Sequence, residues 1–90
     1  MADVYLSNQA EKFLKTLQGP DSERITAALS LLSQVPVPFK TYDVKKISGF
    51  EHGYRIRIGA YRLIYILYPK EQVIRVLKIE RKDDSTYKRL

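Results

Sequence analysis

The chain has 90 residues, with 16 Lys or Arg against 10 Asp or Glu, a formal net charge of +6 at pH 7 and no cysteine. This length allows one hydrophobic core, so we expect a single domain over residues 1–90, and the absence of cysteine excludes disulfides and thiolate metal sites. The first residues lack the pattern of a secretory signal, and no apolar run approaches the roughly 18 residues of a membrane helix, which predicts a cytoplasmic protein with no membrane partner.

Positive charge is concentrated in the second part of the sequence. Residues 1–39 hold three Lys or Arg against four Asp or Glu, whereas residues 40–90 hold thirteen against six. We therefore expect a polyanion such as a nucleic acid to bind the second part. A solvated basic face that only aids solubility explains the charge equally well.

The first part of the sequence predicts a strand followed by two antiparallel helices. Residues 3–6 alternate in the manner of a half-buried strand. Asn8 and Glu11 have the spacing of a capping box before a first helix, and Pro20 suits the first turn of a second helix that ends at Pro36. The apolar stripe of the second helix comprises Ile25, Ala28, Leu29, Leu32 and Val35.

The second part predicts a three-stranded antiparallel meander over residues 54–58, 61–68 and 73–79. The almost wholly apolar middle run is typical of a central strand. Gly59 and Ala60 form a two-residue turn of type II′, and residues 69–72 form a looser four-residue turn.

Residues 39–53 have the weakest pattern, which indicates a basic loop with a short extended piece. Beyond Glu80, the sequence predicts a short C-terminal tail helix that contains Tyr87. The fold class is therefore α+β: a strand, two antiparallel helices, a three-stranded antiparallel meander and a tail helix.

The two turns predict which side chains share a face of the sheet. The first turn sets Arg57 opposite Arg62, with Arg55 two residues back on the same face. If the second turn closes between Tyr68 and Val73, Arg62 lies opposite Ile79 and Arg81 is its diagonal neighbour on that face, with Glu80 on the other face. Four arginines then converge, and a bound anion would stabilise this arrangement. The alternative is that the four side chains point apart into solvent.

Metal and covalent chemistry have no support in the sequence. The only histidine, His52, is expected in an exposed turn, and no cluster of carboxylates has ligand spacing. No Ser nucleophile has a base near it in the sequence. What remains is phosphate chemistry without a metal or other cofactor, for which RNA supplies its own nucleophile, the 2′-hydroxyl.

The stretch from Tyr54 to Tyr65, YRIRIGAYRLIY, resembles the central signature of the RelE/ParE superfamily of toxins. The predicted helix pair, the Lys46-Ile47-Ser48-Gly49 segment and the six-residue spacing from Arg81 to Tyr87 are also similar to that family. This spacing favours the RelE-like branch, whose members cleave mRNA, over the branch that inhibits DNA gyrase.

The resemblance implies roles for individual residues. Arg62 is expected to bind the scissile phosphate and Arg81 to support the leaving 5′ oxygen. Arg55 and Arg57 stand where well-known RNase members have lysines, and arginine cannot act as a base near neutral pH. Tyr87 is therefore the candidate general base, although a tail tyrosine that only packs on the core is an alternative. The expected catalytic residues are Arg57, Arg62, Arg81 and Tyr87, and the expected RNA-binding residues are Lys45, Lys46, Arg55 and Lys82.

The resemblance also implies the biological role. It implies a toxin of a type II toxin–antitoxin system that cleaves mRNA in the ribosomal A site and that a cognate antitoxin neutralises. The alternatives are a ParE-like inhibitor of DNA gyrase without enzymatic activity and a plain RNA-binding module.

Overall fold

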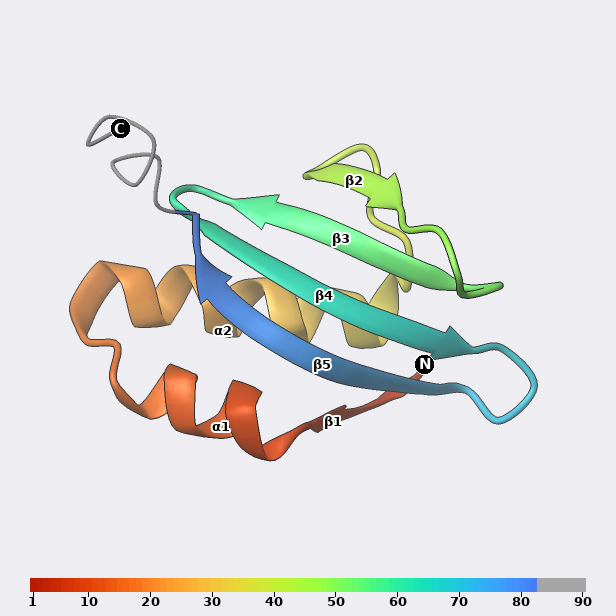
Figure 1. Cartoon of the computed structure of the whole chain (residues 1–90), viewed down its shortest axis with the longest axis horizontal. Coiled ribbons are helices and arrows are strands. Elements are labelled where there is room, and N and C mark those ends of the chain that lie inside the picture. Colours follow the sequence, from red (N-terminus) through yellow and green to blue (C-terminus); the bar gives the residue numbers. More distant parts are fainter. Residues whose placement is uncertain (83–90) are drawn as a thin grey trace.

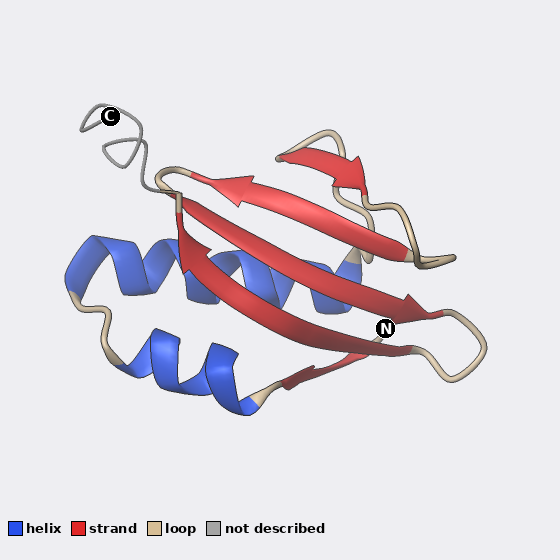
Figure 2. Cartoon of the chain, in the orientation of Figure 1, coloured by secondary structure: helices blue, strands red, loops and turns tan. Residues whose placement is uncertain are grey.

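The computed structural model describes residues 1–82 of the chain. Two helices cover one face of a five-stranded sheet, and α2 runs behind the strands in Figure 1. No helix of residues 1–82 lies on the opposite face of the sheet (Figure 2). This arrangement confirms the predicted α+β class. The predicted tail helix lies outside the described residues. The elements are β1 (Asp3–Leu6), α1 (Asn8–Lys15), α2 (Gly19–Gln34), β2 (Asp43–Lys46), β3 (Gly53–Ile58), β4 (Tyr61–Tyr68) and β5 (Val73–Arg81).

The strands lie in the order β1-β5-β4-β3-β2, so the apolar run 61–68 forms the central strand, as predicted. β1 pairs in parallel with β5, and the other pairs are antiparallel. β2 is the short extended piece expected within residues 39–53, and it forms one edge of the sheet. Neither helix in the described part of the chain is long and apolar enough to cross a membrane.

The core lies between the helices and the sheet. Ile25, Ala28 and Leu32 of the predicted α2 stripe are fully buried, whereas Val35 follows the helix and is 44% exposed, so its predicted place in the stripe is wrong. Tyr65 is fully buried, and its hydroxyl donates a hydrogen bond of 2.6 Å to the carbonyl oxygen of Pro36. Burial raises the pKa of the Tyr65 phenol well above its ordinary value.

The first helix begins one residue earlier than the predicted capping box implies. Ser7, not Asn8, is the N-cap, because its Oγ accepts a hydrogen bond of 3.1 Å from the backbone N–H of Ala10. The same hydroxyl donates to the carbonyl oxygen of Leu77 at 2.7 Å. The N-terminus of α1 is thereby tied to β5.

Both predicted turns are confirmed. Gly59 has a φ of 59°, which suits the first position of a type II′ turn, and Ile58 pairs with Tyr61 as expected. In the second turn, Gln72 has a φ of 56° and Tyr68 pairs with Val73. Arg57 therefore lies directly opposite Arg62.

The predicted register of the second hairpin is wrong beyond its middle, because β5 contains a β-bulge. Ile64 pairs with Lys78 but Tyr65 pairs with Val76, which leaves Leu77 as the extra residue. As a result, Arg62 faces Glu80 rather than Ile79. A bulge of this kind moves every later side chain of the strand to the other face.

Candidate functional site

Two rows of charged side chains cross the sheet on the face opposite the helices. The first row is Asp43, Arg57, Arg62 and Glu80, and the second row is Lys45, Arg55, Ile64 and Lys78. Directly paired residues of antiparallel strands share a face, so all of these side chains lie on one side. We call this surface the arginine face. It brings together three of the four predicted arginines and Lys45.

Carboxylates pair with some of these cations. Glu80 Oε2 accepts from Arg62 Nε at 3.0 Å and forms an ion pair with Arg62 Nη2 at 2.8 Å, and Glu80 Oε1 lies 3.3 Å from Lys78 Nζ. Asp43 Oδ2 lies 3.3 Å from Arg55 Nη2. Arg57 takes part in none of the ion pairs within residues 1–82. Positive charge on this face therefore exceeds what its carboxylates neutralise.

Some guanidinium donors on the arginine face are left without acceptors. Within residues 1–82, Arg55 Nε, Arg55 Nη2 and Arg57 Nε are shielded from solvent and make no hydrogen bond. A buried donor without an acceptor costs about 1–3 kcal/mol, and more when it is charged. Folding alone does not account for this arrangement, whereas phosphate oxygens are suitable acceptors for guanidinium groups.

Arg81 does not lie on the arginine face, contrary to the prediction. The bulge sets it opposite Tyr61 on the helix side, where its Cζ is 5.7 Å from the centre of the Tyr61 ring and its Nη1 donates to the Tyr61 hydroxyl at 3.5 Å. The Tyr61 hydroxyl itself donates to Asp21 Oδ2 at 2.8 Å. This hydrogen bond to Asp21, together with burial, raises the pKa of Tyr61, so its phenol stays protonated and is no base at neutral pH.

Glu80 does lie on the face opposite Arg81, as predicted, but that face is the arginine face. Lys46 pairs with Tyr54 and so belongs to the helix side, unlike its neighbour Lys45. Lys82 directly follows β5, and its backbone N–H donates to the carbonyl oxygen of Ala60 at 2.6 Å. Tyr87, the predicted base, lies outside the described residues.

One signal in the sequence indicates the bulge that the prediction missed. Within residues 73–79 the exposed cations are Arg75 and Lys78, three residues apart, and the buried Val76 and Ile79 have the same spacing. A regular strand keeps a spacing of two on each face. The change of spacing within residues 73–79 therefore marks the extra residue.

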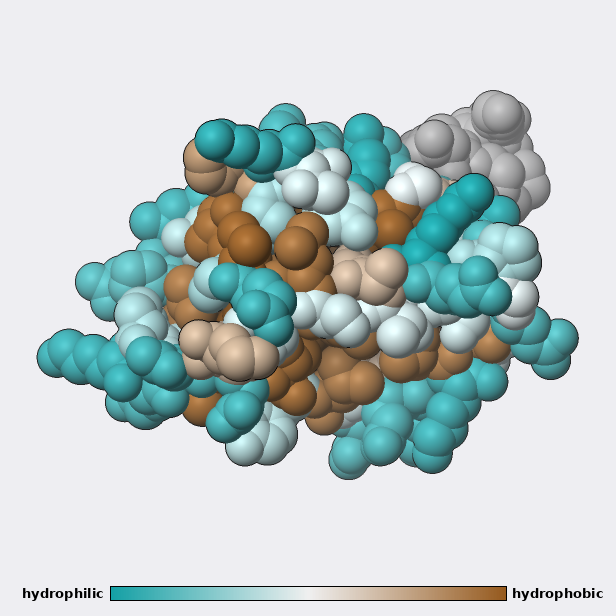
Figure 3. All heavy atoms as spheres, turned by 180° about the vertical axis from the view of Figure 1, so that it is seen from behind, coloured by the Kyte–Doolittle hydropathy of each residue, from teal (hydrophilic) through white to brown (hydrophobic). Residues whose placement is uncertain are grey.

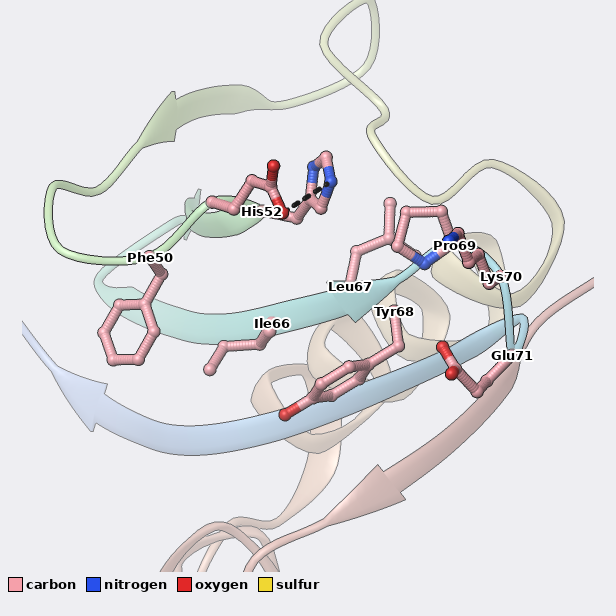
Figure 4. Close-up of a pocket in the computed structure, with 9 residues that line it drawn as sticks. Phe50, His52, Ile66, Leu67, Tyr68, Pro69, Lys70 and Glu71 are labelled. Atoms are coloured by element: carbon pink, nitrogen blue, oxygen red, sulfur yellow. Dashed lines mark ion pairs between the residues drawn. The ribbon is translucent and has the colours of Figure 1, made fainter.

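An apolar groove of about 770 Å³ lies at the other end of β4. Figure 4 shows Phe50, Ile66 and Tyr68 along it, and Ile66 pairs with Gly53, which places the groove on the same side of the sheet as the arginines. A Cβ at position 53 would come within 2.9 Å of Phe50 Cβ, so only glycine lets the loop lie this close. His52 lies in the turn expected for it, with its Nε2 3.8 Å from Glu51 Oε1, the contact that Figure 4 marks.

The helix side has a different surface. Seen from behind, it exposes apolar residues across its middle with hydrophilic residues around them (Figure 3). Part of this surface is a shallow groove between α2 and β1, lined by Val4, Leu6 and Leu29. Among residues 1–82, no group of three or more His, Cys, Asp or Glu is arranged to hold a metal ion.

Comparison with known proteins identifies the family. The model of the ParE toxin of type II toxin–antitoxin systems, parDE, matches residues 4–85. The chain belongs to the RelE/ParE superfamily of toxins. This membership confirms the resemblance seen in the central signature.

Several relatives of this toxin carry RelE names. The putative toxin RelE1 of Methanocaldococcus jannaschii is 27% identical over 83 residues, which are 92% of each chain. The archaeal RelE–RelB complex from Pyrococcus horikoshii contains a chain that is 32% identical, with a TM-score of 0.83 over 92% of this chain and 97% of that one. The isolated Escherichia coli RelE toxin is 18% identical, with a TM-score of 0.77 over 99% and 94%, and shows the fold alone.

Proposed function

We propose that this toxin is a metal-independent endoribonuclease that cleaves mRNA on its arginine face. The observation that carries the proposal is the direct opposition of Arg57 and Arg62 across β3 and β4. Two unit charges about 4 Å apart repel by about 1 kcal/mol in water and about 4 kcal/mol at an effective dielectric constant of 20. A phosphate between them turns this repulsion into attraction from both sides.

The arginine face supplies what attack by the 2′-hydroxyl requires from an enzyme. The strand must be aligned, and the negative charge of the phosphorane must be stabilised. We assign the stabilisation to Arg62 and Arg57. Lys45 and Arg55 lie two residues further along their strands, roughly 7 Å away, and hold a neighbouring phosphate.

The aromatic groove continues the same surface toward a base of the RNA. Phe50 is 47% exposed and Tyr68 is 37% exposed, so both rings are open to a partner. Proteins that bind single-stranded RNA combine a cationic track for the backbone with aromatic rings on which bases stack. The arginine face and the groove together have this composition.

We assign the proton and the leaving group to residues at the C-terminal end of the chain. The arginines cannot accept a proton at neutral pH, and both oxygens of Glu80 are engaged by Arg62 and Lys78. We therefore retain Tyr87 as the proposed general base. Arg81 remains the proposed support of the 5′ oxygen. Because Arg81 and Arg62 lie on opposite faces of the sheet, this role requires the RNA to pass around the end of the sheet.

We also propose that the toxin acts in the cytoplasm, on mRNA in the ribosomal A site, and that it has a cognate antitoxin. The solved complexes from Pyrococcus horikoshii and Methanococcus jannaschii pair RelE with the antitoxin RelB. The arginine face and the apolar helix side offer an antitoxin an electrostatic and a hydrophobic surface. Lys46 and Lys82 are proposed to add to the attraction for RNA.

The second candidate function is inhibition of DNA gyrase without enzymatic activity, and the ParE description of the matching family model favours it.

Translation in a purified cell-free system, followed by primer extension on the mRNA, tests the proposed endoribonuclease. Discrete cuts at A-site codons support the endoribonuclease. Intact mRNA with inhibited supercoiling by gyrase supports the second candidate, and RNA binding without cuts supports a plain binding module.

A further inference from the structure

Glu80 reaches Arg62 because of the bulge at Leu77. Without the extra residue, Ile79 would lie opposite Arg62 and Glu80 would point to the helix side. With it, Ile79 is fully buried in the core, and the Glu80 carboxylate lies on the arginine face. The bulge thus places a negative charge on a surface that otherwise attracts anions.

The contact has a defined geometry. Arg62 Nε donates to Glu80 Oε2 at 3.0 Å, and Arg62 Nη2 forms an ion pair with the same oxygen at 2.8 Å. The other oxygen, Oε1, lies 3.3 Å from Lys78 Nζ. The contacts with Oε2 engage the edge of the guanidinium formed by Nε and Nη2. The described part of the chain provides no hydrogen-bond acceptor for Arg62 Nη1. The edge formed by Nη1 and the second N–H of Nη2 remains available for two phosphate oxygens.

We propose that Glu80 is a positioning residue, which orients Arg62 so that this open edge faces the scissile phosphate. The proposal rests on the proposed function, because it takes Arg62 as the group that stabilises the phosphorane. Glu80 itself does not touch the substrate. It weakens the attraction of the face for RNA, since it is negative, but it fixes the direction of the guanidinium that acts in the transition state.

Two other roles fit the contacts less well. A general base needs a free oxygen, whereas both oxygens of Glu80 are engaged by cations. An ion pair that serves only stability is expected to contribute little, because the side chains of Arg62 and Glu80 are 36% and 26% exposed. A positioning role requires neither a free oxygen nor a large contribution to folding.

Asp43 offers a matched control on the same face. Its carboxylate lies 3.3 Å from Arg55 Nη2, but that nitrogen makes no hydrogen bond, and Asp43 is 49% exposed. Asp43→Asn therefore removes one negative charge from the arginine face without releasing Arg62. Glu80→Gln removes the same charge and also the charged acceptor of Arg62.

The test measures RNA affinity and single-turnover cleavage separately, on programmed ribosomes with the full-length toxin. We expect both variants to bind RNA about 2- to 5-fold more tightly, because each loses one repelling charge. Glu80→Gln should cleave about 10- to 100-fold more slowly than Asp43→Asn, which loses the same charge but keeps Arg62 held by Glu80. Glu80→Asp keeps the charge but shortens the reach by one methylene, so it should cleave slowly without tighter binding.

A second readout reports on the arginine itself. ¹⁵N relaxation of Arg62 Nε should show an ordered side chain in the wild type and a mobile side chain in Glu80→Gln. The thermal unfolding of Glu80→Gln should be the same as that of the wild type. Cleavage at the wild-type rate by both Glu80 variants would overturn the positioning role. So would an Arg62 side chain that is as ordered in Glu80→Gln as in the wild type. If Arg62→Ala is inactive in that case, the proposed function still stands. A wild type that cuts no RNA overturns both proposals.

Discussion

Arg57 and Arg62 face each other across β3 and β4, one pair away from the Gly59-Ala60 turn, and only Arg62 of the two has a carboxylate partner in the described part of the chain. The pair is therefore asymmetric. Arg62 is held by Glu80, whereas Arg57 has a shielded Nε without an acceptor. Removing one or the other should have different consequences for stability and for activity.

Arg62→Ala should remove most of the cleavage while leaving the fold intact. We expect the single-turnover rate to fall by about 100-fold or more, roughly 3 kcal/mol of transition-state stabilisation. The free energy of unfolding should change by less than about 1 kcal/mol, because the ion pair is partly exposed. Arg75→Ala is the control, since Arg75 is an exposed arginine that pairs with Ile66 on the same side of the sheet. Equal rates for the two variants would remove Arg62 from the mechanism.

Arg57→Ala should stabilise the protein while weakening its function. Removing one of two facing positive charges should raise the free energy of unfolding by as much as about 1 kcal/mol. Affinity for single-stranded RNA should fall, because a phosphate loses one of its two cationic contacts. Urea unfolding and fluorescence polarisation with a labelled oligonucleotide measure the two effects. A less stable variant with unchanged affinity would mean that Arg57 serves the fold.

Phe50→Ala tests the aromatic groove as a place for a base. The ring is 47% exposed, so its loss should affect the free energy of unfolding little. RNA affinity should fall by roughly 5- to 100-fold, the usual range for one stacked base. Phe39→Ala is the matched control, because Phe39 is 68% exposed and does not line the groove. If both variants bind RNA like the wild type, the groove has another use.

Tyr65 should make the stability of the protein fall at high pH. Burial raises the pKa of its phenol above the value of 10.0 for an exposed tyrosine, so the unfolded chain loses this proton first. The contribution of the Tyr65 phenol to the free energy of unfolding is fully present below pH 10 and is lost as the pH rises above 10. Tyr65→Phe should be less stable at pH 7 by about 1–2 kcal/mol, because Pro36 loses a hydrogen bond, and should depend less on pH above 10. Tyr5→Phe, at an exposed position, is the control, and its urea unfolding at pH 7 should match that of the wild type.

The sequence predicts those parts of the site that depend on short-range turn chemistry. Gly59 and Ala60 can close a two-residue turn in only a few ways, so the opposition of Arg57 and Arg62 follows from four neighbouring residues. The places of Glu80 and Arg81 depend instead on contacts across the whole chain. Gln9 donates to and accepts from the backbone of Ile79, and these bonds hold β5 beyond the bulge.

The same difference explains the other corrections to the fold. Ser7 caps α1 while it also binds Leu77, a partner 70 residues away that no local pattern contains. The parallel pairing of β1 with β5 likewise joins the two ends of the described chain. Local patterns therefore predict the elements, and long-range hydrogen bonds decide which face of the sheet the last strand presents.

Tyr87→Phe tests the general base, which lies outside the described residues. Within residues 1–82, the arginines keep their protons, the Tyr61 phenol donates to Asp21, and both Glu80 oxygens are paired with cations. The variant should keep antitoxin and ribosome binding, because the ring remains, but should lose about 10²- to 10⁴-fold in the rate of cleavage. Wild-type cleavage should rise with pH as a phenol ionises, and the variant should lack that rise. Cleavage at the wild-type rate with the wild-type pH profile would mean that Tyr87 only packs, and that the proton goes to a group supplied by the ribosome.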